Sequence, residues 1–121
     1  MKLSQINYKF DEPIEVEIKD PETGKSFEKP AFIKIISVES EAGKKIQLDL
    51  YREVVQTNDE NKEVDTRKYL AKLITGWRGI EDEETGKEIP FSYEQAVNLL
   101  ENPIIFQLVN KETAKVGNFK K

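Results

Sequence analysis

The spacing of apolar residues changes once along this chain, near Ser40. Before that point apolar residues alternate with polar ones, as in Ile14, Val16 and Ile18, whereas after it they recur every third or fourth residue. Alternation is typical of a strand with one buried face, and the longer spacing is typical of an amphipathic helix. Strands followed by helices predict an α+β fold, in which an N-terminal antiparallel β-hairpin or small sheet packs against three or four α-helices.

The N-terminal part contains two alternating runs that predict strands, residues 6–10 and residues 14–18. Pro13 separates them, and a residue without an N–H belongs at the start of a strand or on a sheet edge. Residues 20–25 read Asp-Pro-Glu-Thr-Gly-Lys, which predicts a reverse turn because proline presets φ and glycine accepts positive φ. A denser apolar run at residues 32–38 predicts the returning strand, which we expect to lie centrally.

The first helix is predicted after Ser40, which is a suitable N-cap, although Gly43 weakens its first turn. Ile46, Leu50 and Val54 lie four residues apart and define its apolar face. Three further apolar residues are expected to widen that same face: Leu48, Tyr51 and Val55.

Three more helix signals follow. The polar residues 57–62 predict a break, after which apolar residues between positions 69 and 77 predict a second helix that ends near Gly76 or Gly79. Ser92 and Gln95 fit a capping box at the start of a third helix. Asn102-Pro103 predicts a fourth helix, which we expect to stop at Gly117. Its expected buried stripe consists of Ile104, Ile105, Leu108, Val109 and Val116.

The amino-acid composition excludes several classes of function. The chain has no Cys and no His, so thiol nucleophiles, Cys or His zinc sites and histidine bases are excluded. Its 23 acidic and 19 basic residues give a net charge of -4, which disfavours nucleic-acid binding. No apolar run approaches the roughly 20 residues of a membrane helix, and no export leader is recognisable. We expect a soluble single domain over residues 1–121, with a β-rich part at 5–38, a helical part at 40–117 and a short tail at 118–121.

The acidic cluster at residues 81–84 suggests a site for Ca²⁺ or Mg²⁺, but its spacing does not fit an EF-hand loop. A solvated surface loop is the main interpretation, and a cation site is the alternative. No pair of acids stands out for acid–base chemistry, and there is no glycine-rich phosphate loop. We therefore expect a protein that is not an enzyme and binds no metal or cofactor. The six residues at 82–87 nearly repeat those at 20–25, which indicates the same turn used twice.

Two aromatic residues have alternative interpretations. Trp77, the single Trp, either closes the core or anchors a partner, since Trp is enriched at binding hot spots. Phe119, in a basic C-terminal tail, either docks on its own domain or contacts a partner.

Residues 73–92 read Leu-Ile-Thr-Gly-Trp-Arg-Gly-Ile-Glu-Asp-Glu-Glu-Thr-Gly-Lys-Glu-Ile-Pro-Phe-Ser. The combination of a Gly-Trp helix end, an acidic glycine turn and a Pro-Phe-Ser helix entry resembles tail assembly chaperones of long-tailed, siphovirus-type bacteriophages and prophages. The strand-turn-strand that ends at Val38, the helix start at Ser40 and the Asn118-Phe119 ending occur in a similar order. The resemblance thus covers most of the chain, and its specific part is residues 77–92.

The resemblance implies a chaperone that binds the tape measure protein, keeps it soluble and promotes assembly of the tail tube. It also implies contacts with the major tail tube protein and with a longer, frameshifted form of the chain, in the host bacterial cytoplasm and not in the mature virion. The alternative is a structural virion component, a tail tube or connector subunit retained in the particle. Oligomeric state stays open, with a homo-oligomer as one alternative. The expected partner-binding residues are Trp77, Ile80, Ile89, Pro90, Phe91 and Phe119.

Overall fold

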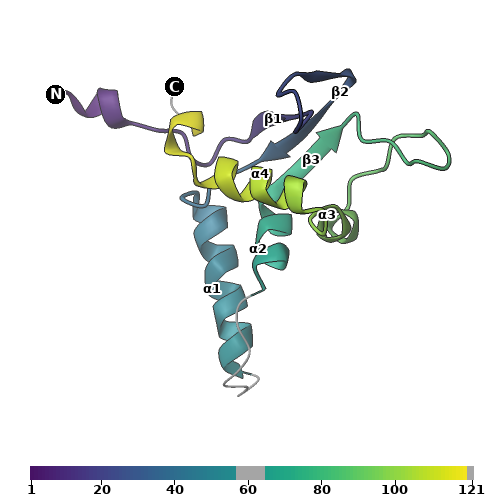
Figure 1. The fold of residues 1–121 in the computed structure, drawn as a ribbon. Coiled ribbons are helices and arrows are strands. Elements are labelled where there is room, and N and C mark those ends of the chain that lie inside the picture. Colours follow the sequence, from purple (N-terminus) through teal and green to yellow (C-terminus); the bar gives the residue numbers. More distant parts are fainter. Residues whose placement is uncertain (57–64, 120–121) are drawn as a thin grey trace.

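The computed structural model describes residues 1–56 and 65–119 (Figure 1). It confirms the predicted α+β class, because an antiparallel sheet packs against α-helices. The predicted break at 57–62 and the last two residues of the tail lie outside the described residues. The elements in chain order are η1 (Leu3–Ile6), β1 (Ile14–Lys19), β2 (Ser26–Ile35), α1 (Glu41–Gln56), α2 (Thr66–Leu73), β3 (Ile74–Arg78), α3 (Tyr93–Leu99), α4 (Pro103–Ala114) and η2 (Val116–Phe119).

The sheet has the order β1-β2-β3, and both pairings are antiparallel. Ile33 of β2 lies opposite Val16 of β1 and opposite Trp77 of β3, which confirms the central position predicted for the returning strand. β2 begins earlier than predicted and ends at Ile35. The chain leaves the sheet after Ile35 because the next amides pair elsewhere: the N–H of Ile36 donates to the carbonyl of Leu73 at 3.0 Å.

The turn predicted between β1 and β2 is confirmed. The N–H of Asp20 donates to the carbonyl of Lys25 at 2.9 Å, and the N–H of Gly24 donates to the carbonyl of Asp20 at 2.8 Å. The Asp20 carboxylate also accepts from the N–H of Glu22 at 2.9 Å. Gly24 has φ +71°, the left-handed conformation that glycine adopts at little cost.

The strand predicted at residues 6–10 is wrong, because η1 ends at Ile6 and the residues that follow form no strand, only an isolated bridge at Tyr8. Its alternating aromatic residues pack on each other instead of on a partner strand: the Tyr8 and Phe10 rings stack at 5.7 Å between centroids. Ile6 remains 52% exposed, so the alternation here does not mark a buried face.

The second predicted helix is too long. α2 ends at Leu73, and the next five residues form β3 instead of continuing the helix to Trp77. The Asp65 side chain caps the start of α2 by accepting from the N–H groups of Arg67 and Lys68. Strand pairing of Ile74 with Ile35 of β2 replaces the hydrogen bonds that a longer helix would have made.

α1 begins after Ser40, as predicted. The Ser40 hydroxyl accepts from the N–H of Gly43 at 2.9 Å and donates to the carbonyl of Ser37 at 2.6 Å. Gly43 does more than the sequence suggested, because a Cβ at this position would lie 2.6 Å from the Ser37 carbonyl oxygen. A glycine is therefore needed for the close approach of α1 to the end of β2 (Figure 1).

The last two helices start at the predicted caps. The Ser92 hydroxyl accepts from the N–H of Gln95 at 3.1 Å, and the Asn102 side chain accepts from the N–H of Ile104 at 2.9 Å. α4 ends at Ala114 and not at Gly117, which lies inside η2. Its buried stripe is partly wrong: Ile105, Val109 and Thr113 are buried, whereas Ile104 and Val116 are exposed.

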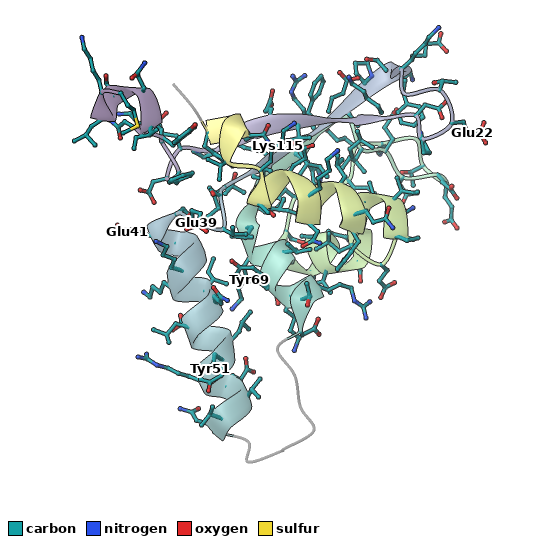
Figure 2. The ribbon with its side chains drawn as sticks, turned by 60° about the vertical axis from the view of Figure 1, so that its left-hand side comes forward. Glu22, Glu39, Glu41, Tyr51, Tyr69 and Lys115 are labelled. Atoms are coloured by element: carbon teal, nitrogen blue, oxygen red, sulfur yellow. The ribbon has the colours of Figure 1, made fainter. Side chains whose placement is uncertain are left out.

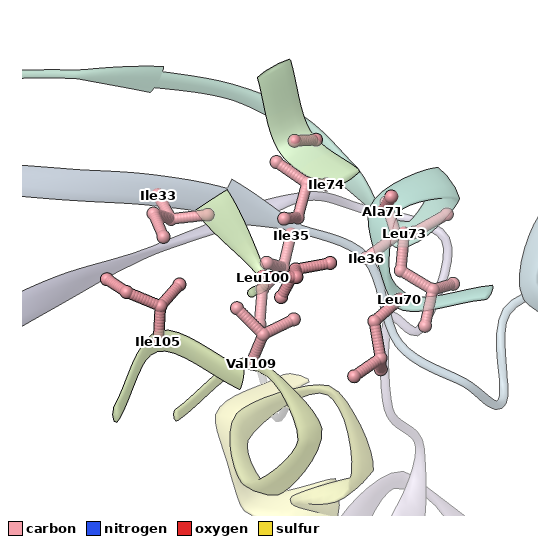
Figure 3. Packing of buried hydrophobic residues seen from close by; sticks show 11 residues of the cluster. Ile33, Ile35, Ile36, Leu70, Ala71, Leu73, Ile74, Leu100, Ile105 and Val109 are labelled. Carbon is pink, nitrogen blue, oxygen red and sulfur yellow. The ribbon is translucent and has the colours of Figure 1, made fainter. Parts of the chain in front are cut away.

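The core lies between one face of the sheet and the helices α2, α3 and α4 (Figure 3). β2 contributes Ile33 and Ile35, each 1% exposed, and α4 contributes Val109 at 1%. α1 contributes less, since Leu50 is its one buried large side chain among the described residues. α1 therefore extends away from the sheet with α2 beside it (Figure 1). The core cluster consists of Ile33, Ile35, Ile36, Leu70, Ala71, Leu73, Ile74, Ala96, Leu100, Ile105 and Val109.

Candidate functional site

Trp77 lies near the end of β3 and contacts the segment that follows it through a hydrogen bond and an aromatic pair. Its Nε1–H donates to the carbonyl of Ile89 at 2.8 Å. Its ring meets the Phe91 ring edge to face, with the centroids 5.0 Å apart and the planes at 88°. Trp77 is half-buried, so it is neither a fully buried core residue nor a freely exposed anchor.

The segment between Trp77 and α3 folds back on itself as an arm that extends from the body (Figure 1). The N–H of Ile89 donates to the carbonyl of Ile80 at 2.8 Å, and Glu81 and Glu88 form an isolated antiparallel bridge. The Glu88 carboxylate accepts from the N–H of Gly79 at 2.5 Å. These bonds make the two ends of the arm a short antiparallel pair.

The tip of the arm repeats the two backbone hydrogen bonds of the β1–β2 turn, as the sequence repeat indicated. The N–H of Asp82 donates to the carbonyl of Lys87 at 2.8 Å, and the N–H of Gly86 donates to the carbonyl of Asp82 at 2.8 Å. The Asp82 carboxylate accepts from the N–H groups of Glu84 and Thr85 at 2.8 and 3.1 Å. Within the part of the chain that the structure describes, no cluster of three acidic side chains is placed to hold a metal ion.

A shallow hollow of about 210 Å³ lies where the base of the arm meets α3. The half-buried side chains of Ile80 and Ile89 border it next to Trp77, while Pro90 and Phe91 are exposed beside it, Phe91 at 41%. The structure thus brings together five of the six predicted partner-binding residues, which we call the Trp77 cluster: Trp77, Ile80, Ile89, Pro90 and Phe91. The side of the hollow on α3 is formed by Gln95, Asn98 and Leu99.

Phe119, the sixth predicted residue, lies in η2 and does not border this hollow. It is 2% exposed, and its ring packs near Phe10 with the centroids 6.2 Å apart. Its carbonyl accepts from the N–H of Lys9 at 2.8 Å. Of its two interpretations, the structure therefore shows docking onto the chain's own N-terminal segment.

A second candidate surface escaped the sequence reasoning. Leu48, Tyr51 and Val55 do not widen the buried face of α1, because they are 47%, 59% and 55% exposed. They form a separate apolar stripe beside an open groove between α1 and α2, of about 620 Å³. The signal was present in the sequence, since α1 has more apolar positions than one buried face of a helix accommodates.

Three ionisable groups outside the Trp77 cluster have shifted pKa values: Glu15, Arg78 and Tyr69. Arg78 donates to both Glu15 carboxylate oxygens, at 3.0 and 3.2 Å, and this lowers the pKa of Glu15 and raises that of Arg78. The Arg78 guanidinium also lies 4.0 Å from the Phe32 ring centroid, so the pair spans the sheet across β2. Burial, and then the nearby Glu39, raise the pKa of Tyr69 at the α1–α2 groove.

Comparisons with known proteins give one match. The sequence model of a family described as YdaY prophage protein matches residues 29–121, which includes β3, the arm and every described α-helix. No curated protein and no solved structure matches the chain. Over the residues that the structure describes, none of the helices combines the length and the apolar character needed to span a membrane.

Proposed function

The chain belongs to the YdaY prophage protein family, and we propose, from the resemblance carried by residues 73–92, that it is a phage tail assembly chaperone that binds the tape measure protein. In this proposal it keeps the tape measure protein soluble, promotes assembly of the tail tube and leaves before the particle is complete. It works in the host bacterial cytoplasm, without catalysing a reaction and without a metal or cofactor. The major tail tube protein and a longer form of the chain are its further partners.

The Trp77 cluster is the observation that carries this proposal. The segment whose sequence resembles tail assembly chaperones is folded as one local unit: a strand end, an acidic turn and a helix entry, joined by the bond from Trp77 to the Ile89 carbonyl. The unit presents Phe91, at 41% exposed, at the base of an arm whose tip is acidic. An apolar contact on an arm that also carries negative charge suits a protein that covers apolar helix faces and keeps the complex in solution.

Covering a long helical protein for a limited time is a task that a small binding protein can perform. A long helical protein exposes apolar faces until the tube encloses it, so it needs a temporary cover. Several weak contacts along its length give useful avidity, and each one is still displaced when tube subunits polymerise. The chain offers two apolar surfaces for such contacts, the Trp77 cluster and the groove between α1 and α2.

Co-expression with the long helical protein encoded nearby tests this function. The wild-type chain should move that protein into the soluble fraction and co-purify with it. Phe91→Ser should reduce the soluble yield, whereas Phe27→Ser, also 41% exposed but located on β2, should not. An insoluble and unbound long protein beside a well-folded wild-type chain would refute the chaperone role.

Mass spectrometry of purified particles separates the chaperone from a tail tube or connector subunit. A chaperone is absent from mature particles. A structural component is retained in amounts comparable to the other tail proteins, and finding the chain at that level would overturn the proposal.

A further inference from the structure

β1 is an edge strand, because the sheet has the order β1-β2-β3 and β1 pairs with β2 alone. Alternate residues of an antiparallel strand direct their N–H and C=O groups to opposite sides, so about half of the backbone groups of β1 point away from β2. Among residues 1–56 and 65–119, no backbone hydrogen bond joins this outer side of β1 to another segment. The outer side therefore presents a row of unpaired donors and acceptors, which is a template for a further strand.

The edge is regular over most of its length. The register of β1 with β2 runs without a shift from Ile14 to Ile18, and the irregularity comes at Lys19. Pro13, which has no N–H to donate, directly precedes the strand. Bulges, prolines and lysines commonly block the edges of sheets, and here they lie at the two ends of β1. The stretch between them is open to pairing.

A groove of about 570 Å³ lies between the outer side of β1 and α4. Every residue of β1 borders it, and α4 contributes Ile104, Leu108 and Glu112, which lie four residues apart on one side of the helix. Ile104 is 46% exposed and Leu108 is half-buried, so this wall of the groove is apolar over its first turn. In Figure 2, β1 runs beside α4, with Glu22 in the turn beyond the strand and Lys115 at the C-terminal end of the helix. A strand added at the edge would place alternate side chains in this groove.

The charged residues that line the groove are mostly acidic: Glu15, Glu17, Lys19, Asp20 and Glu112. Three of the acids accept hydrogen bonds within the chain: Glu15 from Arg78, Asp20 from the N–H of Glu22, and Glu112 from the Asn118 side chain. Glu17 differs, because its Oε2 is buried and has no hydrogen-bond partner in the described part of the chain. The ion pairs seen among the described residues do not include Glu17, although Lys19 lies two residues further along the same face of β1.

An added strand can satisfy Glu17. The residues of β1 alternate between two faces: Val16 and Ile18 pack against the core, and Glu17 lies on the opposite face. Side chains that share a face on neighbouring strands lie within contact distance. A Lys or Arg beside Glu17 would donate to the unpaired carboxylate oxygen, and apolar residues on the other face would cover Ile104. The segment that fits this edge is thus extended, with apolar and basic residues in alternation.

The β1 strand of a second copy does not have this composition. Antiparallel pairing of two β1 strands that keeps their apolar faces together brings Glu17 opposite Glu15 or opposite Glu17 in the registers that pair most of the strand. Like charges directly opposite each other destabilise a sheet. The chemistry of the edge therefore disfavours self-pairing of β1.

We propose that the outer edge of β1 binds an extended segment of another protein as a fourth strand of the sheet, with apolar residues directed toward Ile104 and Leu108 and a Lys or Arg beside Glu17. Backbone hydrogen bonds hold the segment, and the alternating side chains select it. The inference does not rest on the proposed chaperone function, whose main partner is a helical protein, so either one can fail without the other.

Two synthetic peptides test the side-chain preference. Each has about eight residues, the length of an ordinary strand, with valine at alternate positions and either lysine or glutamate between them. In calorimetric titration of the full chain at low salt, the lysine peptide should bind about tenfold more tightly than the glutamate peptide. The preference should shrink as salt screens the charges. Equal affinities, or tighter binding of the glutamate peptide, would overturn the proposal.

N-methylation of the lysine peptide tests whether backbone hydrogen bonds hold it. Methylating the amides of one alternate set removes the donors that face β1, and methylating the other set leaves those donors intact. One of the two methylated peptides should therefore lose at least about tenfold in affinity, and the other should bind like the parent peptide. Equal effects of the two sets would show that the peptide is not bound as a strand and would overturn the proposal.

Variants of the chain locate the binding site. Glu17→Lys should abolish the preference for the lysine peptide, whereas Glu53→Lys, which changes the net charge equally at an exposed position of α1, should preserve it. Ile104→Ser should weaken binding of the lysine peptide at least about fivefold, whereas Leu48→Ser, at a position 47% exposed on α1, should not. In variants with wild-type circular dichroism, an unchanged preference in Glu17→Lys or unchanged binding by Ile104→Ser would exclude the β1 edge.

Analytical ultracentrifugation of the chain without peptide tests a second copy as the occupant of the edge. The wild-type chain and Ile104→Ser should have the same oligomeric state, because the edge is unpaired in both. A wild-type dimer that Ile104→Ser dissociates would assign the edge to a second copy and overturn the proposal.

Discussion

Removing the Trp77 side chain in two steps should separate its hydrogen bond from its packing. Trp77→Phe keeps an aromatic ring in β3 but loses the Nε1–H that donates to the Ile89 carbonyl at 2.8 Å. A neutral hydrogen bond contributes about 0.5–1.5 kcal/mol, so the free energy of unfolding should fall by about 1 kcal/mol. Trp77→Ala also removes the ring, and because Trp77 is only half-buried the loss should be about 2–3 kcal/mol, below the 3–5 typical of a fully buried aromatic residue.

The contact between Trp77 and Phe91 contributes a coupling energy, which can be measured separately. Edge-to-face aromatic pairs contribute about 0.5–1.5 kcal/mol beyond the area that they bury. A double-mutant cycle with Trp77→Ala and Phe91→Ala should therefore show a coupling energy of that size. Urea unfolding followed by far-ultraviolet circular dichroism is the suitable assay, because two of the variants lack the only Trp.

Two results would refute this reasoning. If Trp77→Phe is as stable as the wild-type chain, the bond to Ile89 does not hold the arm. If the coupling energy with Phe91 is zero, the two rings do not act together, and the Trp77 cluster is not a single unit. In either case the geometry of the arm would have to be maintained by its own backbone bonds.

Two further predictions concern the sheet and the base of the arm. Gly79→Ala should destabilise the fold by about 3 kcal/mol or more, because φ is +82° and a Cβ would lie 2.3 Å from the Pro30 carbonyl oxygen. Gly86→Ala, with φ +69° and open space around it, should lose only about 1 kcal/mol by the same urea assay, and equal losses would contradict the steric argument. The lowered pKa of Glu15 means that its pairing with Arg78 stabilises the fold fully above the ordinary value of 4.5 and is lost as pH falls through the lower folded value. Between neutral pH and about pH 3 the wild-type chain should therefore lose more stability than Glu15→Gln, and parallel losses would show that the pair contributes nothing.

Local signals predicted much of the fold. The caps at Ser40, Ser92 and Asn102 are encoded within three residues of each helix start, and each of these side chains accepts a hydrogen bond from a first-turn N–H as expected. Of the capping box predicted at Ser92 and Gln95, the structure shows the bond to the Ser92 hydroxyl. The turn at residues 20–25 is equally local. These predictions succeed because a side chain near a helix start or a turn satisfies the same backbone groups whatever the rest of the chain does.

Where local signals gave the wrong element, pairing between strands distant in the sequence determined the structure. The apolar residues around Trp77 fit a helical spacing, yet Ile74 and Trp77 pair with β2 because the edge of that strand is available. The opposite error occurs at residues 6–10, where alternation is present but β1 already occupies the other edge of β2. Periodicity describes which side chains share a face, and it does not indicate whether a partner strand lies beside them.

For the candidate site, too, the parts joined by local bonds were predictable and the parts formed by distant segments were not. The Trp77 cluster spans 15 residues of sequence and is joined by local bonds, so its members could be expected to meet. The bond between the Phe119 carbonyl and Lys9 links opposite ends of the chain, and no spacing rule foresees it. The stripe of Leu48, Tyr51 and Val55 looked buried because helical periodicity gives the apolar faces of a helix but not how many of them the body covers.

The twin turns at residues 20–25 and 82–87 imply an order of events during folding. Each turn closes through bonds between residues four or five positions apart, and such contacts form on the microsecond timescale of hairpins. The pairing of β2 with β3 must instead close the long segment that carries α1 and α2, at a larger entropic cost. We expect the β1–β2 hairpin and the tip of the arm to form first and β3 to dock afterwards. Substitutions in the first turn should then slow folding, whereas substitutions in β3 should mainly speed unfolding.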